Sequence, residues 1–319
     1  MTASETALVT GCAGFIGSQL TESLLADGVR VIGVDCFNDN YGRSEKLRNL
    51  DLARGWERFE FVPLDLARGD LGGLVAESDV VFHLAAEPGV RASWGLRFEH
   101  YMRNNVSATQ HLLEAAHLHP GRRFVYASSS SVYGSAERLP TPEESLCRPH
   151  SPYGVTKLAA ENMCLLYHAN LGVDTVALRL FSVFGPRQRP DMAFRRLIGA
   201  SLNGSPFELY GDGTQTRDFT YAEDAVSAMR AAALSEWCGV ANIGGGTRTS
   251  MDEVIAVMEE LSGPIRVVRK SEQKGDVRHT GADITVASSQ FGYNPRTMLR
   301  AGLEQMLRWA SERVGPTTT

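Results

Sequence analysis

Short apolar runs alternate with segments of helical spacing along the first 180 residues. The runs are rich in β-branched residues and lie at 6–11, 29–35, 59–65, 79–86, 122–128 and 174–181. Between them, the spacing of apolar positions predicts helices at 15–26, 98–118 and 152–169. Because strands and helices that alternate in this way form a parallel sheet, we predict an α/β fold with a doubly wound sheet. We expect each strand to be buried on both faces.

The alternation weakens beyond residue 180. Two turn-rich stretches, "FGPRQRPDMAF" and "LYGDGTQTRDFTY", precede a helix pattern at 250–262. We therefore expect residues 1–180 to form the main domain and residues 181–319 to form mainly a smaller C-terminal lobe. The apolar run "GVANIGGG" at 239–246 predicts one more strand, so a segment near 215–245 is expected to return to the main domain. The end, "VGPTTT", is expected to be frayed.

Charge and cysteine content argue against several classes of partner. The formal net charge is −5 and the basic residues are scattered, which disfavours a nucleic-acid or membrane surface. No apolar stretch approaches the roughly 18 residues of a membrane span, and the start of the chain lacks a signal-peptide pattern. The five cysteines include no CxxC pair and no metal-ligand spacing with histidine. We predict a cytoplasmic protein with free thiols and no metal.

A glycine-rich turn, "VTGCAGFIGSQL", connects the first strand to the first helix. Its glycines, Gly11, Gly14 and Gly17, allow a tight turn and let a pyrophosphate approach the amides of a helix N-terminus. The second strand ends in Asp35, whose carboxylate can accept hydrogen bonds from the adenosine ribose and repel a 2′-phosphate. We predict a Rossmann-type domain that binds NAD in preference to NADP. The alternative is that the glycines serve only helix packing.

The third and fourth strands also end in residues suited to a dinucleotide. Asp65 ends "PLD", where a carboxylate would face the adenine. "HLAA" at 83–86 ends the fourth strand with small residues, as a flat ring passing nearby would require. We expect His83 to be a packed or hydrogen-bonded strand residue, not a catalyst.

A tyrosine and a lysine lie four residues apart in "SPYGVTK". Ser151 and Pro152 are typical of a helix start, so Tyr153 and Lys157 are expected on one helix face. The lysine cation and an oxidised nicotinamide would favour the phenolate and lower the pKa of Tyr153 from about 10. Tyr153 is therefore a candidate base. Because this spacing occurs by chance in many helices, the prediction depends on the glycine turn and on the serines of "FVYASSSSVYG".

Together these motifs resemble the extended short-chain dehydrogenase/reductase family over nearly the whole chain. The matching segments are TGCAGFIG, the strand-end Asp35, HLAA, the serines before VYG, and YGVTK. Similar members are NAD-dependent nucleotide-sugar epimerases, dehydratases and decarboxylases. The resemblance implies NAD as cofactor, a UDP-sugar site in the smaller lobe, and homodimerisation through the helices at 98–118 and 152–169.

The resemblance also implies roles for individual residues. The catalytic set it implies is Ser129, Tyr153 and Lys157. The cofactor-binding set is Gly11, Gly14, Phe15, Ile16, Gly17, Asp35, Asn38, Asp65, Leu66, Leu84, Ala85, Ala86, Asn105, Tyr153 and Lys157. The substrate-binding set is Arg91, Ser129, Ser130, Ser131, Tyr153, Ser182, Arg189, Arg217 and Asp276.

Several positions distinguish the branches of this family. The 4,6-dehydratases carry Asp-Glu in the places of Ser130 and Ser131, and the UDP-glucuronate decarboxylases carry a glutamate in the place of Ser131. UDP-glucose 4-epimerases usually place Asn-Pro where Ser182-Val183 stands. The segments "VDCFNDNYG", "AAEPGVRAS", "YASSSSVYG" and "FGPRQRPDMAF" look most like UDP-glucuronate 4-epimerases. This likeness implies that Ser129 serves the 4-hydroxyl and that Ser130 and Ser131 serve the sugar carboxylate.

Alternatives stay open at this point. The substrate can instead be UDP-glucose or UDP-N-acetylglucosamine, the reaction can be decarboxylation of UDP-glucuronate, or the fold can be a non-catalytic NAD sensor. Ser130 and Ser131 can simply satisfy the backbone at a strand end. Arg91 and Arg189 can be surface arginines. Gln273 stands where some epimerases have an arginine, which leaves the group that completes the diphosphate site open.

Overall fold

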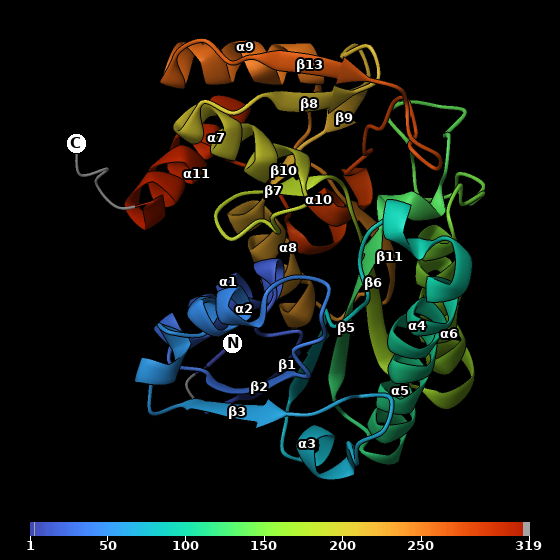
Figure 1. Ribbon diagram of the computed structural model, residues 1–319. Helices are drawn as coiled ribbons and strands as arrows, with labels where there is room; N and C mark the ends of the chain where they lie inside the picture. Colours follow the sequence, from blue (N-terminus) through green and yellow to red (C-terminus); the bar gives the residue numbers. More distant parts are fainter. Residues whose placement is uncertain (3, 315–319) are drawn as a thin grey trace.

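The computed structural model describes residues 1–2 and 4–314 (Figure 1). Within them, seven strands form one parallel sheet in the order β11-β6-β5-β4-β1-β2-β3. These strands are β1 (Thr6–Thr10), β2 (Arg30–Asp35), β3 (Phe59–Pro63), β4 (Val80–His83), β5 (Arg123–Ser129), β6 (Asp174–Leu180) and β11 (Gly239–Ile243). The predicted doubly wound, Rossmann-type sheet is confirmed. From β1 the strand order runs to β2 and β3 on one side and to β4, β5 and β6 on the other, so the order reverses between β1 and β4. Sheets of this kind bind ligands at this point, at the carboxyl ends of the strands.

Helices cover both faces of this sheet (Figure 1). One face packs against α1 (Phe15–Ala26), α8 (Ala222–Leu234) and α10 (Thr285–Phe291), and the other against α3 (Gly72–Ala76), α5 (Ala108–Leu118) and α6 (Pro152–Leu171). Alternate residues of β1 divide between the two cores, with Ala7 and Val9 in the first and Leu8 in the second. The shorter helices of this part are α2 (Arg43–Asn49), α4 (Phe98–Tyr101), η1 (Ala53–Gly55), η2 (Arg91–Ser93), η3 (Gly95–Arg97) and η5 (Ser130–Val132).

Strand β3 departs from the expectation of burial on both faces. It is the edge strand of the sheet beside β2, and Glu60 and Pro63 are exposed. The apolar run at 59–65 therefore marked the strand correctly but not its place in the sheet. An edge strand has one neighbour, so its outer side remains open to water.

The helical pattern at 98–118 contains a wide turn that the spacing did not predict. Between α4 and α5, Met102–Ser107 forms a π-helix. Such turns are rare and often occur beside functional sites. Here the side chain of Asn105 is buried and bonds the backbone of Glu87, while Asn104 faces the cavity described below.

The second lobe has its own apolar core and lies at the top of Figure 1. Its elements are α7 (Ala193–Asn203), α9 (Met251–Ser262), α11 (Leu299–Val314), β7 (Val183–Phe184), β8 (Phe207–Tyr210), β9 (Thr216–Asp218), β10 (Thr220–Tyr221), β12 (Arg248–Ser250) and β13 (Val267–Lys270). A capping box between Ser250 and Glu253 begins α9. Val314 ends α11, and the rest of the segment expected to be frayed lies outside the described residues. None of the described helices combines the length and apolarity needed to cross a membrane.

Candidate functional site

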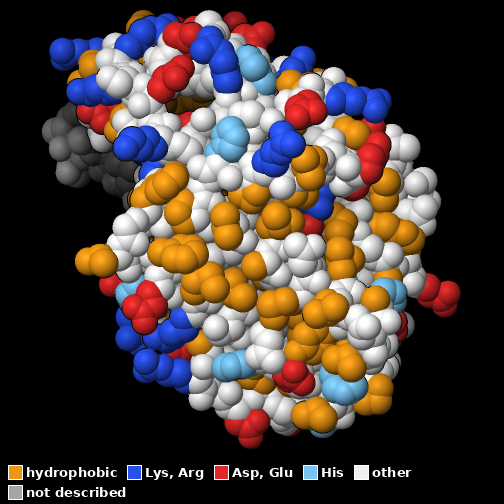
Figure 2. Space-filling view, turned by 90° about the vertical axis from the view of Figure 1, so that its right-hand side faces the viewer, with side chains coloured by type: hydrophobic (Ala, Val, Ile, Leu, Met, Phe, Trp, Pro, Cys, Tyr) orange, Lys and Arg blue, Asp and Glu red, His pale blue; other side chains and the backbone are white. Residues whose placement is uncertain are grey.

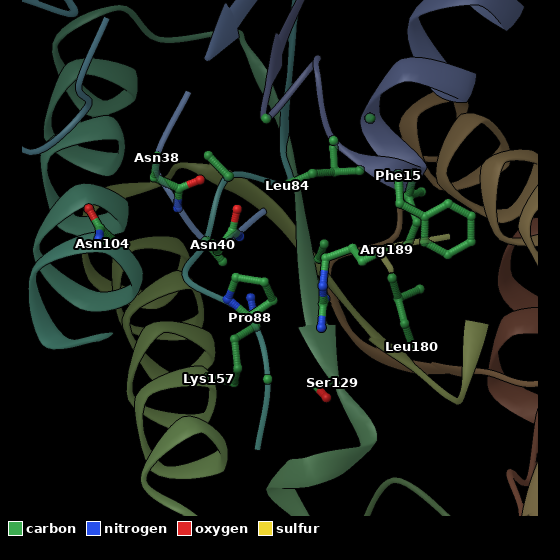
Figure 3. A pocket seen from close by; sticks show the side chains of 18 of the residues that line it. Phe15, Asn38, Asn40, Leu84, Pro88, Asn104, Ser129, Lys157, Leu180 and Arg189 are labelled. Atoms are coloured by element: carbon green, nitrogen blue, oxygen red, sulfur yellow. The ribbon is translucent and has the colours of Figure 1, made fainter. Parts of the chain in front are cut away.

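A cavity of about 440 Å³ lies at the carboxyl ends of the parallel strands (Figure 3). That volume is within the range of small-molecule and cofactor sites. The cavity brings together most of the residues expected at the site. They are Gly11, Gly14, Phe15, Ile16, Gly17, Asp35, Asn38, Asp65, Leu66, Leu84, Ala85, Ala86, Ser129, Ser130, Ser131, Tyr153, Lys157, Ser182 and Arg189.

The glycine turn has the geometry of a dinucleotide cradle. Gly11 has a φ of +71°, and a Cβ there would lie 2.9 Å from the amide nitrogen of Ala85. A Cβ at Gly17 would lie 2.1 Å from the carbonyl oxygen of Gly11. Gly14 precedes α1, whose first turn has no side-chain cap. The backbone amides of this first helical turn are therefore free to bind a pyrophosphate, and the glycine-rich turn fits NAD.

Asp35 ends β2 at the wall of the cavity. Its carboxylate accepts hydrogen bonds from the backbone amides of Phe37 at 2.8 Å and Ala13 at 3.2 Å, which fix its orientation. Burial raises the pKa of Asp35, and the ammonium of Lys46 and the two amides oppose that rise. The carboxylate is thus held in place where the adenosine ribose would lie. Asp65 also lines the cavity, paired with Arg103.

Lys46 is a cavity residue that the sequence analysis did not assign. It lies on α2, is 3% exposed, and donates to the carbonyl and side-chain oxygens of Asn38. The Asn38 amide in turn donates to Glu87 at 2.8 Å. The segments after β2 and β4 are therefore joined across the adenosine end of the cavity. The sequence did contain one indication that Lys46 has a specific role, because it is among only four lysines in an arginine-rich chain.

Tyr153 and Lys157 lie in the first two turns of α6, which begins at the Ser151 cap and Pro152 as predicted. The pKa of Tyr153 is raised, because burial outweighs the opposing effects of Ser129 and Arg189, and the lowering by Lys157 that the sequence predicted is not seen. Burial lowers the pKa of Lys157 to about 7, so the ammonium charge is lost as pH rises through that value. The Lys157 ammonium lies 4.4 Å from the centre of the Tyr126 ring.

The four serines at the end of β5 have different surroundings. Ser128 also lines the cavity, and its hydroxyl donates to Glu161 at 2.6 Å. Ser129 accepts a hydrogen bond from the amide of Ser131 and so caps η5. Its hydroxyl also lies 3.1 Å from that of Ser131. Ser130 and Ser131 line the cavity, and the backbone bond of this strand end is made by Ser129.

Arg189 extends into the cavity toward the end of β5 that carries Ser129 (Figure 3). A bidentate contact with Asp191, at 3.0 and 2.9 Å, fixes its guanidinium, and its side chain is 18% exposed. Its positive charge lowers the pKa of Tyr153. Arg189 is therefore placed to attract an anionic group at the same end of the cavity as the serines.

Four expected site residues do not line the cavity. Asn105 is buried behind it, where it bonds the backbone of Glu87 and the hydroxyl of Thr156 at 2.9 Å, so in this structure it supports the wall and does not face the cofactor site. Arg91 pairs with Asp276 at 2.8 Å. Arg91 and Asp276 both interact electrostatically with Arg217, so these three residues form a separate charged group between the lobes.

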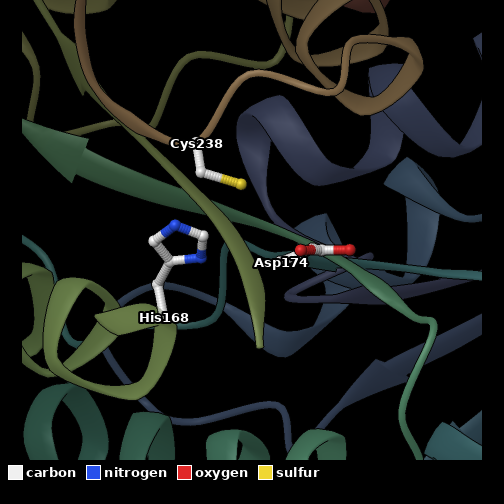
Figure 4. A group of neighbouring side chains, drawn as sticks. All are labelled: His168, Asp174 and Cys238. Atoms are coloured by element: carbon white, nitrogen blue, oxygen red, sulfur yellow. The ribbon is translucent and has the colours of Figure 1, made fainter. Parts of the chain in front are cut away.

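A further cluster lies outside the cavity and comprises His168, Asp174 and Cys238 (Figure 4). Their potential ligand atoms are within 4.8 Å of one another. It lies where β6 begins, at the opposite end of the strands from the cavity. The Cys238 sulfur already accepts from the guanidinium of Arg123 at 3.2 Å, and a cation at that position opposes a metal ion.

Comparison with known proteins places these features in a family. The model of the Epimerase family, described as the NAD dependent epimerase/dehydratase family, matches residues 7–244. An uncharacterized UDP-glucose epimerase, YtcB of Bacillus subtilis, is 44% identical over 95% of this chain and 97% of its own length. A UDP-glucuronate 4-epimerase of Thermodesulfobacterium geofontis is 34% identical over 96% of both chains.

Solved structures give the same result. The UDP-glucuronic acid 4-epimerase from Bacillus cereus, in complex with UDP-glucuronic acid and NAD, superposes with a TM-score of 0.93. It is 42% identical, and the match covers 97% of this chain and 99% of that one.

Proposed function

This chain belongs to the NAD-dependent epimerase/dehydratase family of extended short-chain dehydrogenases/reductases, as its motifs predicted, and from this we propose that it is a UDP-glucuronate 4-epimerase. It is an NAD-dependent enzyme, and the proposed reaction interconverts UDP-glucuronate and UDP-galacturonate through a 4-keto intermediate. We place the reaction in the cytoplasm, since all five cysteines are free thiols.

The observation that carries this proposal is the polarity of the sugar end of the cavity. Ser130, Ser131 and Ser182 present hydroxyls there, and Arg189 presents a guanidinium. Among the described residues that line the cavity, the carboxylates are Asp35, which ends β2, and Asp65, which follows β3, both at the adenosine end. This lining suits an anionic sugar. It also lacks the acid and base that a dehydratase would need beside the sugar.

The mechanism follows from the positions of the catalytic residues. NAD, when bound in the cradle, accepts the hydride from carbon 4 and later returns it. Tyr153 as a phenolate accepts the proton of the 4-hydroxyl, and Ser129 shares that hydroxyl through a hydrogen bond. Lys157 in its cationic form favours the phenolate. After the 4-keto sugar has rotated to present its other face, Tyr153 returns the proton, and the configuration at carbon 4 is inverted.

The diphosphate and uridine are assigned to the charged group between the lobes. We propose that Arg217 binds the diphosphate and Asp276 the uridine ribose, with Arg91 lining the sugar site. Arg91 currently contacts Asp276, so binding requires these side chains to exchange partners. Both are partly exposed, and such a pair has little stability to lose.

The substrate is tested directly by product analysis. Purified protein is incubated with UDP-glucuronate and, separately, with UDP-glucose, and the nucleotide sugars are resolved by chromatography. We expect UDP-galacturonate from the first incubation. Conversion of UDP-glucose alone would instead favour the activity for which the YtcB relative is named.

Asp35 should determine the choice of dinucleotide. We expect the wild-type protein to purify with NAD, and Asp35→Ala to weaken NAD binding about tenfold, which is the effect of losing one hydrogen bond to a charged group. The variant should also discriminate less against NADP, because the repulsion of the 2′-phosphate is removed. Calorimetric titration of apo-protein with both dinucleotides measures this. Equal affinity of the wild type for NADP would contradict the role of Asp35.

We also propose that the protein is a homodimer joined through the layer of α4 to α6. This face carries exposed apolar side chains, among them Phe98, Met102, Val155 and Leu166 (Figure 2). A patch of this kind on one face is typical of an interaction site. Val155→Arg with Leu166→Arg should give a monomer in sedimentation equilibrium. Leu234→Arg on α8 is the control, since Leu234 is also exposed, at 63%, but on another face, and its replacement should leave the dimer intact.

A further inference from the structure

The segment that carries Arg189 contains a non-glycine residue in the left-handed backbone region. Arg187, two residues before Arg189, has a φ of +66°. Residues other than glycine rarely adopt this conformation, and where they do, the surrounding contacts hold them there, often beside a functional site. Arg189 lines the cavity, whereas Arg187 is not part of the lining. The backbone at Arg187 therefore needs an explanation outside the cavity.

Contacts with the NAD-binding domain hold this segment in place. Arg187 Nη2 donates to both carboxylate oxygens of Glu22 on α1, at 2.8 and 2.9 Å. The two side chains are only 11% and 23% exposed, and an ion pair shielded in this way is screened less than one at the surface. One turn earlier on α1, the Gln19 amide donates to the Pro186 carbonyl at 3.0 Å. The segment is thus attached twice to the helix whose first turn forms the NAD cradle.

The residue between Arg187 and Arg189 is attached to the smaller lobe instead. Gln188 is 3% exposed, and its side chain donates to the Val183 carbonyl at 3.1 Å and accepts from the Arg195 amide at 2.9 Å. Val183 belongs to β7, and Arg195 to α7. The contacts through Gln188 therefore place Arg189 relative to the smaller lobe, and the contacts with α1 place it relative to the cofactor site.

We propose that Arg187 and Glu22 are positioning residues, which hold Arg189 at the sugar end of the cavity, where its guanidinium meets the carboxylate of the substrate. The cavity lining includes neither of them, so both act through the backbone that leads to Arg189. Asp191 fixes the guanidinium of Arg189 within its segment, and the pair with Glu22 fixes that segment on α1. Only the identity of the bound carboxylate rests on the proposed function, because the position of Arg189 is a property of the protein alone.

Replacing Arg187 should weaken the binding of an acidic sugar and leave that of a neutral sugar nearly unchanged. Arg187→Ala removes the ion pair and leaves alanine in a conformation that it rarely adopts, so the segment should relax and Arg189 should move away. We expect NAD-loaded protein to bind UDP-glucuronate about tenfold more weakly, as for the loss of one hydrogen bond to a charged group. Calorimetric titration with UDP-glucuronate and with UDP-glucose measures both affinities. An equal loss for the two sugars would indicate general disruption and would overturn the proposal.

Two further variants test the ion pair itself. Glu22→Gln leaves Arg187 in the chain and removes only the charge that holds it, so it should also weaken the binding of UDP-glucuronate selectively. Arg187→Lys keeps a cation for Glu22 and should retain most of the affinity, since a single nitrogen makes both contacts in the wild type. In an Arg189→Gln background, Arg187→Ala should cause little further loss, because the group that it positions is already absent.

The matched control is Glu45→Gln. Glu45 of α2 pairs with Arg195 of α7 at 3.2 Å, so this ion pair also joins the two parts of the chain, and its side chains are 14% and 25% exposed. Arg195 lies outside the segment that leads to Arg189, so Glu45→Gln should leave the affinity for UDP-glucuronate unchanged. A loss as large as that of Glu22→Gln would mean that any weakening of this junction suffices, which would contradict a specific role for Arg187.

The position of Arg189 is tested without any sugar by crystal structures of Glu22→Gln and Arg187→Ala with NAD. We expect residues 186–189 to move away from α1 and the Arg189 guanidinium to leave the end of β5, toward which it extends in Figure 3. Because Arg187→Ala can impair folding, Glu22→Gln is the decisive variant. If the wild type did not bind UDP-glucuronate, the proposed function would fail and this displacement would still be expected. An unmoved Arg189 in Glu22→Gln would overturn the positioning role.

Discussion

Tyr153→Phe should lower the rate of epimerisation by about 10² to 10⁴-fold, the usual contribution of a positioned acid-base group. The change removes one hydroxyl from the cavity and leaves the ring, which packs edge-on against Tyr101 with the ring centres 6.3 Å apart. Binding of UDP-glucuronate should therefore change little. Turnover and calorimetric affinity measured on the same preparation test both parts of the expectation.

The matched control is Tyr167→Phe on the same helix. The Tyr167 hydroxyl contacts Glu114 and Gln110, far along α6 from the cavity, so its removal should leave turnover near the wild-type value. If Tyr153→Phe retained turnover within a factor of two of wild type, another group would have to be the base. The proposed mechanism would then be wrong at its first step.

The sequence predicted those parts of the fold that depend on local patterns. Strand and helix alternation was enough for the doubly wound sheet, and Ser151 with Pro152 marked the start of α6 within one residue. The edge position of β3 was not predictable in this way, because strand order depends on contacts between distant segments. The π-helix at Met102–Ser107 was also missed, since helical spacing does not reveal one additional residue in a turn.

In the candidate site, too, the residues predicted correctly are those that belong to local motifs. Motif residues after β1, β2, β4 and β5 reach the cavity because the carboxyl ends of parallel strands share one edge of the sheet. Asn105 was assigned from a motif position, but its side chain turns inward to Glu87.

Replacing the two cavity serines should increase decarboxylation of the reaction intermediate. Oxidation at carbon 4 makes the sugar a β-keto acid, because the carboxylate is attached to carbon 5 beside the new ketone. Loss of carbon dioxide requires the breaking bond to lie roughly perpendicular to the carbonyl plane, and it moves negative charge from the carboxylate toward the ketone. Ser130 and Ser131 would oppose both the bond rotation and the charge movement, because their hydroxyls fix the carboxylate and stabilise its charge. Ser182 lies in the same cavity lining and is a further donor.

The size of this effect follows from the strength of the bonds. A hydrogen bond to a charged group contributes about 1.5 to 3 kcal/mol, so losing one should speed decarboxylation roughly ten- to a hundredfold. The measurement is the ratio of 4-keto pentose nucleotide to UDP-galacturonate formed by Ser130→Ala, Ser131→Ala and the double variant.

Ser135→Ala is the control, since Ser135 is exposed and outside the cavity lining. Ser129 already caps the strand end through the amide of Ser131, so loss of either hydroxyl should leave η5 in place. An unchanged ratio in a double variant that still epimerises would therefore mean that neither hydroxyl holds the carboxylate.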